Sequence, residues 1–212
     1  MIVCFSMKKQ EKAQHVFFGL KKIFPEAKIM LHYRNNWELL VAVELSAQCT
    51  DKKVNEITPM LFKKYPKLVD YIKADPREFE KDIYQSGFYK NKTKNILAAA
   101  KMVYEKFSGK IPRTMEEILT IPGVARKTAN VVLGNAYGIV EGVAVDTHVK
   151  RLTKLWGLSK ESSPEKIEKD LMKLLPKEEW FQFTYLAIEY GRTYCTARVK
   201  DHSLCPLGKY EK

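Results

Sequence analysis

The fold of this chain is decided by residues 114–137, which read TMEEILTIPGVARKTANVVLGNAY. Thr114 opens a short helix as part of a Thr-x-x-Glu capping box, and a second helix spans residues 126–137. The connection between them is so short that the chain must turn sharply, and Gly123 supplies the backbone freedom for the turn. We expect the turn to present the amides of residues 123–127 at the positive end of a helix, where proteins bind phosphate. An ordinary pair of packed helices uses the same turn, so the turn alone leaves both interpretations open.

Helical periodicity continues on both sides of this pair. Apolar spacing, dense apolar runs and capping residues predict further helices around residues 16–24, 37–47, 51–62, 92–107, 147–156, 164–175 and 178–190. No alternating strand series and no internal repeat interrupts them, so the sequence predicts an all-α protein. The glycine-containing stretch 138–145 suggests a boundary between two helical lobes near residue 140.

Composition indicates a folded protein with a polyanionic partner. The 212 residues include 37 Lys and Arg against 25 Asp and Glu, which gives a net charge of +12, and 45% of the residues are hydrophobic. That balance excludes disorder as the main state. The basic residues cluster, as in 90–94 and 150–154, which fits nucleic-acid binding and equally fits solvated helix faces.

The sequence also predicts where the protein works. No apolar run is long enough to span a membrane, and the first residues lack the basic start of a secretory signal. Met7 is followed by basic residues, so translation starts at either Met1 or Met7. Four cysteines are too few and too scattered for a disulfide framework. We expect an intracellular protein of the cytoplasm or nucleoid that is a monomer and makes no membrane contact.

Five segments, in order along the chain, resemble the endonuclease III family of helix–hairpin–helix DNA glycosylases. They correspond to the family's glutamine loop, duplex wedge, hairpin, acidic catalytic segment and the start of its metal loop, here residues 45–51, 87–92, 121–130, 145–148 and 191–195. The resemblance implies an all-α, bilobal fold. A six-helix lobe of residues 29–140 contains the hairpin, and residues 1–28 with 141–212 form the second lobe.

The resemblance assigns the catalytic roles to Lys127 and Asp146. The Lys127 amine would attack C1′ of the deoxyribose, which requires its unprotonated form, and the helix start and adjacent Arg126 favour that form. Asp146 would assist departure of the base and stabilise positive charge on the sugar. Taken as single residues, Lys127 also fits a solvent-facing lysine and Asp146 also fits a helix N-cap.

The resemblance also implies a set of DNA contacts. Gln48 would fill the gap left by the flipped base and Phe88 would be the apolar wedge, although Phe88 also fits a core aromatic. Ala125 departs from the family, which usually has a second glycine there, and we expect the hairpin to tolerate it. The remaining expected contacts are Ile121, Gly123, Ala125, Arg126, Thr128, His148, Arg198 and Lys200.

The last expectation concerns metal. The family's iron–sulfur cluster uses the spacing Cys-x6-Cys-x2-Cys-x5-Cys, and the matching positions here are Cys195, His202, Cys205 and Glu211. Two of the four thiolates are missing, so we expect no cluster and no other cofactor, with the loop held by Leu204, Pro206 and helix contacts. A zinc site on the same four residues is the second alternative, and a cluster is the third.

Together these features predict a bifunctional DNA glycosylase/AP lyase. It would bind duplex DNA that carries a damaged base or an abasic site, flip out a damaged pyrimidine, form a Schiff base through a lysine and nick the strand by β-elimination. That the pyrimidine is oxidised is implied by the resemblance alone. The alternatives are a monofunctional mismatch glycosylase, in which water attacks, and a non-catalytic helix–hairpin–helix DNA-binding module.

Overall fold

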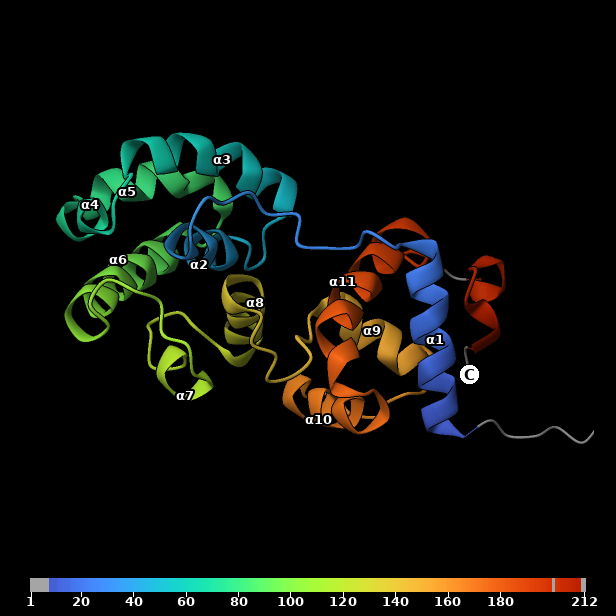
Figure 1. The fold of residues 1–212 in the computed structure, drawn as a ribbon. Coiled ribbons are helices and arrows are strands. Elements are labelled where there is room, and N and C mark those ends of the chain that lie inside the picture. Colours follow the sequence, from blue (N-terminus) through green and yellow to red (C-terminus); the bar gives the residue numbers. More distant parts are fainter. Residues whose placement is uncertain (1–7, 200, 211–212) are drawn as a thin grey trace, which may run out of the picture. The chain divides into compact units, whose positions relative to one another are not determined.

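The computed structural model describes residues 8–199 and 201–210, which divide into two compact units. We call residues Met30–Ile139 the hairpin unit, and the residues up to Ile29 together with those from Val140 onward the terminal unit. Figure 1 shows both units, with the two segments of the terminal unit coloured blue and orange to red. The assignment of residues 29–140 to one functional lobe, and of residues 1–28 with 141–212 to the other, stays a prediction.

The hairpin unit is built around one helix that is buried on nearly every side. This helix, α2 (Asn36–Leu45), is capped by the Asn35 side chain, and eight of its ten residues are buried. Helices α3, α6 and α8 pack against it, α4 and α5 pack against α6, and α7 packs against α8. The other elements of the unit are α3 (Asp51–Lys64), α4 (Leu68–Lys73), α5 (Pro76–Ile83), the 3-10 turn η1 (Tyr84–Ser86), α6 (Tyr89–Lys106), α7 (Met115–Ile118) and α8 (Arg126–Tyr137).

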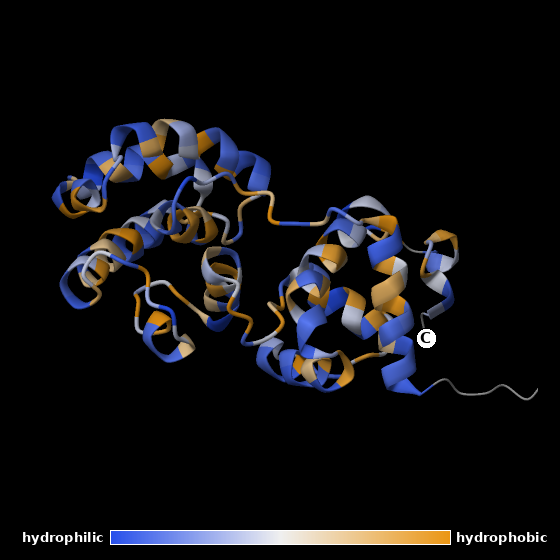
Figure 2. Ribbon diagram, viewed as in Figure 1, coloured by the Kyte–Doolittle hydropathy of each residue, from blue (hydrophilic) through white to orange (hydrophobic). Residues whose placement is uncertain are grey.

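The terminal unit brings together segments from both ends of the chain. Its helices are α1 (Lys9–Ile23), α9 (Thr147–Leu155), α10 (Pro164–Leu174) and α11 (Lys177–Thr193), followed by the 3-10 turns η2 (His202–Leu204) and η3 (Gly208–Tyr210). Helix α11 packs against α1, α9 and α10. Trp156 and Tyr190 are fully buried at the centre of the core, with ring centroids 5.7 Å apart. Apolar residues follow the inner faces of these helices (Figure 2).

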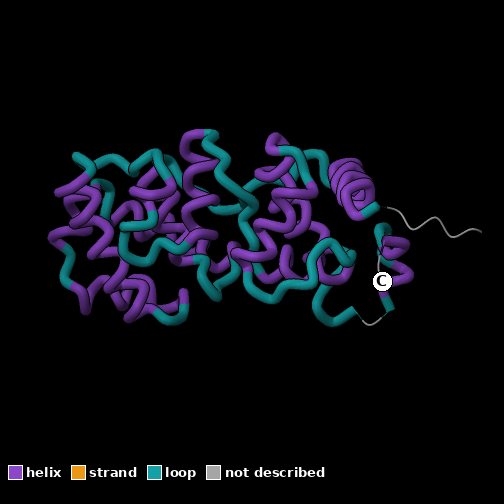
Figure 3. The backbone as a smooth tube through the Cα atoms, turned by 90° about the horizontal axis from the view of Figure 1, so that it is seen from below, coloured by secondary structure: helices purple, strands orange, loops and turns teal. Residues whose placement is uncertain are grey.

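The prediction of an all-α fold is confirmed, because the described residues contain helices, turns and loops without a strand (Figure 3). Several helix ends differ from the sequence-based boundaries: α6 begins three residues earlier than expected, and α11 extends over both ends of the predicted 178–190. The two short helices α4 and α5 were not predicted at all. None of the helices in the described ranges has the length and apolar character to cross a membrane.

Candidate nucleic-acid interface and catalytic residues

The hairpin forms as the sequence predicts. The Thr114 hydroxyl accepts the Glu117 amide at the start of α7, and the chain then turns through Gly123, whose φ is +83°. Ile121 and Val124 are buried and anchor the turn. One detail differs from expectation: the Val124 amide donates to the Ile121 carbonyl at 3.1 Å, so it is used inside the turn and not offered to an anion.

Gly123 is required by packing as well as by conformation. A Cβ on this residue would lie 2.7 Å from Oε2 of Glu44 and 2.9 Å from Cβ of Asn95. The turn therefore rests directly on the last residues of α2, and no larger residue fits without movement. Because its φ is positive, any other residue would also be strained there.

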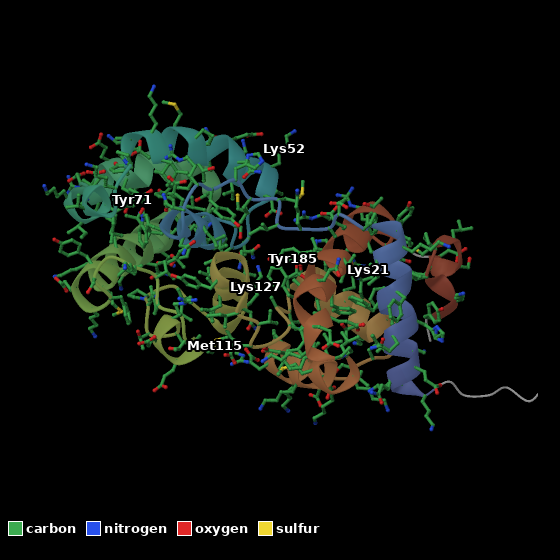
Figure 4. The ribbon with its side chains drawn as sticks, viewed as in Figure 1. Lys21, Lys52, Tyr71, Met115, Lys127 and Tyr185 are labelled. Atoms are coloured by element: carbon green, nitrogen blue, oxygen red, sulfur yellow. The ribbon has the colours of Figure 1, made fainter. Side chains whose placement is uncertain are left out.

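Lys127 lies in the first turn of α8 and is half-buried, so it is neither a core residue nor a fully solvated one (Figure 4). The amides of residues 126–128 precede the first hydrogen bond of the helix, which Ala129 donates to Ala125. Ala125 is the N-cap, with φ −93° and ψ 170°. This is ordinary extended backbone, so the alanine is tolerated as expected. Arg126 and Thr128 flank Lys127 and are also half-buried.

Two loops that carry predicted DNA contacts are strained in the same way. Gln48 follows α2 with φ 53°, and Phe88 precedes α6 with φ 48°. Non-glycine residues at positive φ are uncommon and cluster at functional sites. The Phe88 side chain is 63% exposed, which contradicts the alternative that it is a core aromatic. Gln48 is exposed as well.

Lys92 joins these two loops, a role that the sequence did not reveal. Its Nζ donates to the Leu45 carbonyl at 2.8 Å and to the Ser86 carbonyl at 2.7 Å. Lys92 is buried, so our assignment of this residue to a surface basic cluster with Lys90 and Lys94 was wrong. Burial also lowers the pKa of the Lys92 ammonium. The end of α2 thus meets both the turn before α6 and, through Glu44, the hairpin.

Glu44 is a second buried group that the sequence did not single out. It is buried within α2, and its Oε1 has no hydrogen-bond partner among the described residues. Burial raises the pKa of Glu44 to about 8, so the side chain is largely a neutral acid at pH 7. The signal was present in the sequence as a single acid in the apolar run 39–45, a pattern that predicts a buried carboxyl.

Asp146 belongs to the terminal unit and caps α9, since its Oδ1 accepts the Val149 amide at 2.8 Å. This contact fixes the carboxylate while leaving the residue half-buried. Burial lowers the pKa of the nearby His148 imidazole, and the Asp146 carboxylate opposes that shift. Asp146 and His148 therefore share one environment at the start of α9.

Arg151, one turn further along α9, ties that helix to the end of α11. Its Nη2 donates to the Gly191 carbonyl at 3.3 Å and its Nη1 to Sγ of Cys195 at 3.4 Å. Of the predicted basic cluster 150–154, Lys150 and Lys154 are exposed and Arg151 is partly buried. Lys150 and Lys154 are therefore surface charges, whereas Arg151 holds α9 against the end of α11.

The loop after α11 opposes our expectation that it holds no metal. Cys195, His202 and Cys205 come together so that one potential ligand atom from each lies within 4.8 Å of the others. Leu204, expected to anchor the loop, is 87% exposed, and Leu207 is buried in its place. Arg198 is exposed. Lys200 and Glu211 lie outside the described residues, as do Met1 and Met7.

Comparison with known proteins agrees with this geometry. The model of the HhH-GPD superfamily base excision DNA repair protein matches residues 41–177. The endonuclease III of Synechocystis sp. is 50% identical over 94% of this chain and 91% of its own. Among solved structures, a non-covalent endonuclease III–DNA complex matches with TM-score 0.92 and 42% identity, over 97% of this chain and 96% of the other.

A second solved structure, of a trapped endonuclease III–DNA covalent intermediate, matches with TM-score 0.90 and 42% identity. It covers 95% of this chain and 94% of its own. These matches extend over nearly the full length of both partners and include the hairpin, the glutamine loop and the Asp146 segment. The chain therefore belongs to the HhH-GPD superfamily of base excision DNA repair proteins and, within it, to the endonuclease III family.

Proposed function

We propose that this protein is a bifunctional DNA glycosylase/AP lyase that removes damaged pyrimidines, oxidised ones in particular, from duplex DNA. The observation that carries the proposal is the meeting of three predicted DNA-contacting segments at the end of α2. Lys92 joins the Gln48 loop to the turn before Phe88, and Glu44 lies against Gly123 of the hairpin. The predicted nucleophile Lys127 follows the hairpin directly.

DNA binding begins at the phosphates. The hairpin offers backbone amides at the start of α8, and the dipole of that helix favours an anion there. Further polar or cationic contacts to the DNA phosphates come from Arg126, Thr128, His148, Arg198 and Lys200. Ile121 is buried, so its contribution to DNA binding comes from its main chain.

Base flipping leaves a hole in the duplex that must be filled. Unstacking a base costs a few kcal/mol, and apolar or planar side chains inserted into the stack repay part of it. Phe88 is exposed on a short, strained turn and provides the wedge. Gln48, exposed after α2, fills the gap left by the flipped base.

The covalent step uses Lys127. Its neutral amine attacks C1′, a C–N bond forms, and the glycosidic bond breaks with its electron pair leaving on the base, which takes up a proton. The attacking nitrogen then loses a proton, the C1′–O4′ bond breaks, and O4′ takes up a proton as the ring opens to the Schiff base. Removal of a C2′ proton then expels the 3′ phosphate by β-elimination. Asp146, held by its N-cap contact, stabilises positive charge on the sugar during the attack.

On this proposal Lys127 comes from the hairpin unit and Asp146 from the terminal unit. We infer that the protein acts as a monomer on chromosomal DNA in the cytoplasm, at the nucleoid. The trapped covalent intermediate of an endonuclease III supports a lyase over a monofunctional enzyme.

One experiment separates this function from its two rivals. Purified protein is incubated with a duplex that carries a single oxidised thymine, and products are resolved with and without later alkali treatment. A lyase nicks the strand directly, a monofunctional glycosylase leaves an alkali-sensitive abasic site, and a DNA-binding module leaves the strand intact. A nick without alkali is the expected result, and either other product would overturn the proposal.

A further inference from the structure

Cys195, His202 and Cys205 form a group whose donor atoms lie close enough together to hold a metal ion. Sγ of Cys195 lies 3.2 Å from Nδ1 of His202, and Sγ of Cys205 lies 4.0 Å from the same nitrogen. Both cysteines are buried, and neither forms a disulfide. Two sulfur atoms and an imidazole nitrogen that converge in this way match the preferences of a thiophilic cation.

These residues do not fit the iron–sulfur cluster of the family. A cubane cluster binds one thiolate at each of four separate irons, so its ligands stand apart around the whole cube. Here only two thiolates are present, and the donor atoms crowd within 4.8 Å of one another. The crowding fits one ion and is too tight for a cluster.

We propose that this loop binds a single tetrahedral zinc ion through Sγ of Cys195, Sγ of Cys205 and Nδ1 of His202. Zinc–sulfur bonds of about 2.3 Å and zinc–nitrogen bonds of about 2.0 Å at tetrahedral angles place donor atoms roughly 3.5–3.8 Å apart. The observed sulfur–nitrogen separations of 3.2 and 4.0 Å lie on either side of that range. These three residues supply three of the four ligands of a tetrahedral zinc site.

The surroundings of the site suit this role. The Arg151 guanidinium donates to Sγ of Cys195 at 3.4 Å, and a cation in that position stabilises the thiolate that a metal requires. Two consecutive turns wind the chain around the site: the Cys205 amide donates to the His202 carbonyl at 2.9 Å, and the Gly208 amide donates to the Cys205 carbonyl at 2.8 Å. A Cβ on Gly208 would lie 2.1 Å from the His202 carbonyl oxygen, so this winding requires glycine.

Zinc would hold the segment 202–210 against the helices of the terminal unit. The segment after the site already packs inward, since the Leu207 amide donates to the Tyr190 hydroxyl at 3.0 Å and the Lys12 ammonium donates to the Tyr210 carbonyl at 3.0 Å. A metal joining Cys195, two residues after α11, to His202 and Cys205 would lock this segment in place. The site is therefore structural, and its loss is expected to lower stability before it lowers catalysis.

The test is elemental analysis of the full-length protein, purified from cells supplied with both iron and zinc. We expect about one zinc per chain, negligible iron and a colourless protein. His202→Ala and Cys205→Ser should each lose most of the zinc. Matched controls His32→Ala and Cys49→Ser, which alter the same residue types in the hairpin unit, should retain it.

A second measurement covers the case in which a ligand variant fails to fold. Wild-type protein is stripped with a chelator and titrated with Co²⁺, and the thiolate-to-cobalt charge-transfer band and the visible bands of tetrahedral cobalt are expected at one equivalent. Stoichiometric iron with inorganic sulfide, absence of any bound metal, or full zinc retention by both ligand variants would overturn the proposal. None of these results bears on the lyase chemistry.

Discussion

Lys92 shows how a single buried cation supports two loops that are predicted to contact DNA. Its ammonium donates to the Leu45 and Ser86 carbonyls. These carbonyls lie just before the two loops that carry Gln48 and Phe88. We predict that Lys92→Met destabilises the protein by about 2 kcal/mol, because two carbonyls lose a charged donor. Denaturant unfolding measures this effect. Cleavage should fall as well, since the Gln48 and Phe88 loops lose their common support.

The control for that prediction is Lys94→Met, two residues further along α6, where the side chain is exposed. It should leave the unfolding free energy nearly unchanged. If both variants unfold alike, Lys92 does not join the loops as described.

Glu44 makes a prediction about pH. Burial raises its pKa to about 8 in the folded protein, whereas the unfolded chain ionises near its usual 4.5. Between pH 4.5 and pH 8 the unfolded chain has released the Glu44 proton and the folded protein still holds it. The free energy of unfolding therefore falls as the pH rises, by up to about 1.4 kcal/mol per pH unit. Glu44→Gln removes this cost. Its stability advantage over wild type should grow from about pH 5 to pH 8, and parallel stability curves would refute a buried neutral acid.

At the scale of elements, the hairpin depends on Gly123. Gly123→Ala introduces a Cβ against Glu44 at a residue with positive φ, so we predict destabilisation of about 1–3 kcal/mol and weaker binding to abasic-site DNA. Thermal unfolding and a binding titration measure the two effects. Ala125→Gly, two residues later at an ordinary extended position, should change both only slightly. Equal losses in the two variants would show that the turn conformation is unimportant.

The sequence predicted those elements whose signals are local. The caps at Thr114 and Asp146 and the turn at Gly123 each depend on nearby residues, and each is present in the structure. Helices α4 and α5, of six and eight residues, were missed because so short a helix shows little periodicity. The Asp75-Pro76 start of α5 was the one signal available.

Contacts that depend on the tertiary fold could not be predicted from the sequence. The buried position of Lys92 depends on carbonyls 47 and 6 residues away. The anchor of the last loop is Leu207 and not Leu204, because the turns after His202 rotate one inward and the other outward. The catalytic candidates Lys127 and Asp146 were available only through the family resemblance, since each residue has an ordinary structural use.

At the scale of the whole molecule, the charge of +12 predicts strong dependence of DNA binding on salt. Exposed lysines such as Lys90, Lys94, Lys150 and Lys154 are available to phosphates. A protein that neutralises six or more phosphates loses about a thousandfold in affinity between roughly 50 and 200 mM salt. We predict a loss of that order for undamaged duplex, measured by fluorescence anisotropy. A flat dependence would mean that the positive charge does not face DNA.

On the proposed mechanism, Lys127 forms the covalent bond to DNA. Sodium borohydride added to the protein with abasic-site duplex reduces a Schiff base to a stable cross-link, which a denaturing gel resolves and peptide mass spectrometry locates. Wild type and the surface control Lys101→Gln should give the cross-linked band, with DNA attached at residue 127, and Lys127→Gln should give none. Cross-linking of Lys127→Gln equal to wild type, or attachment at another residue, would show that Lys127 is not the nucleophile.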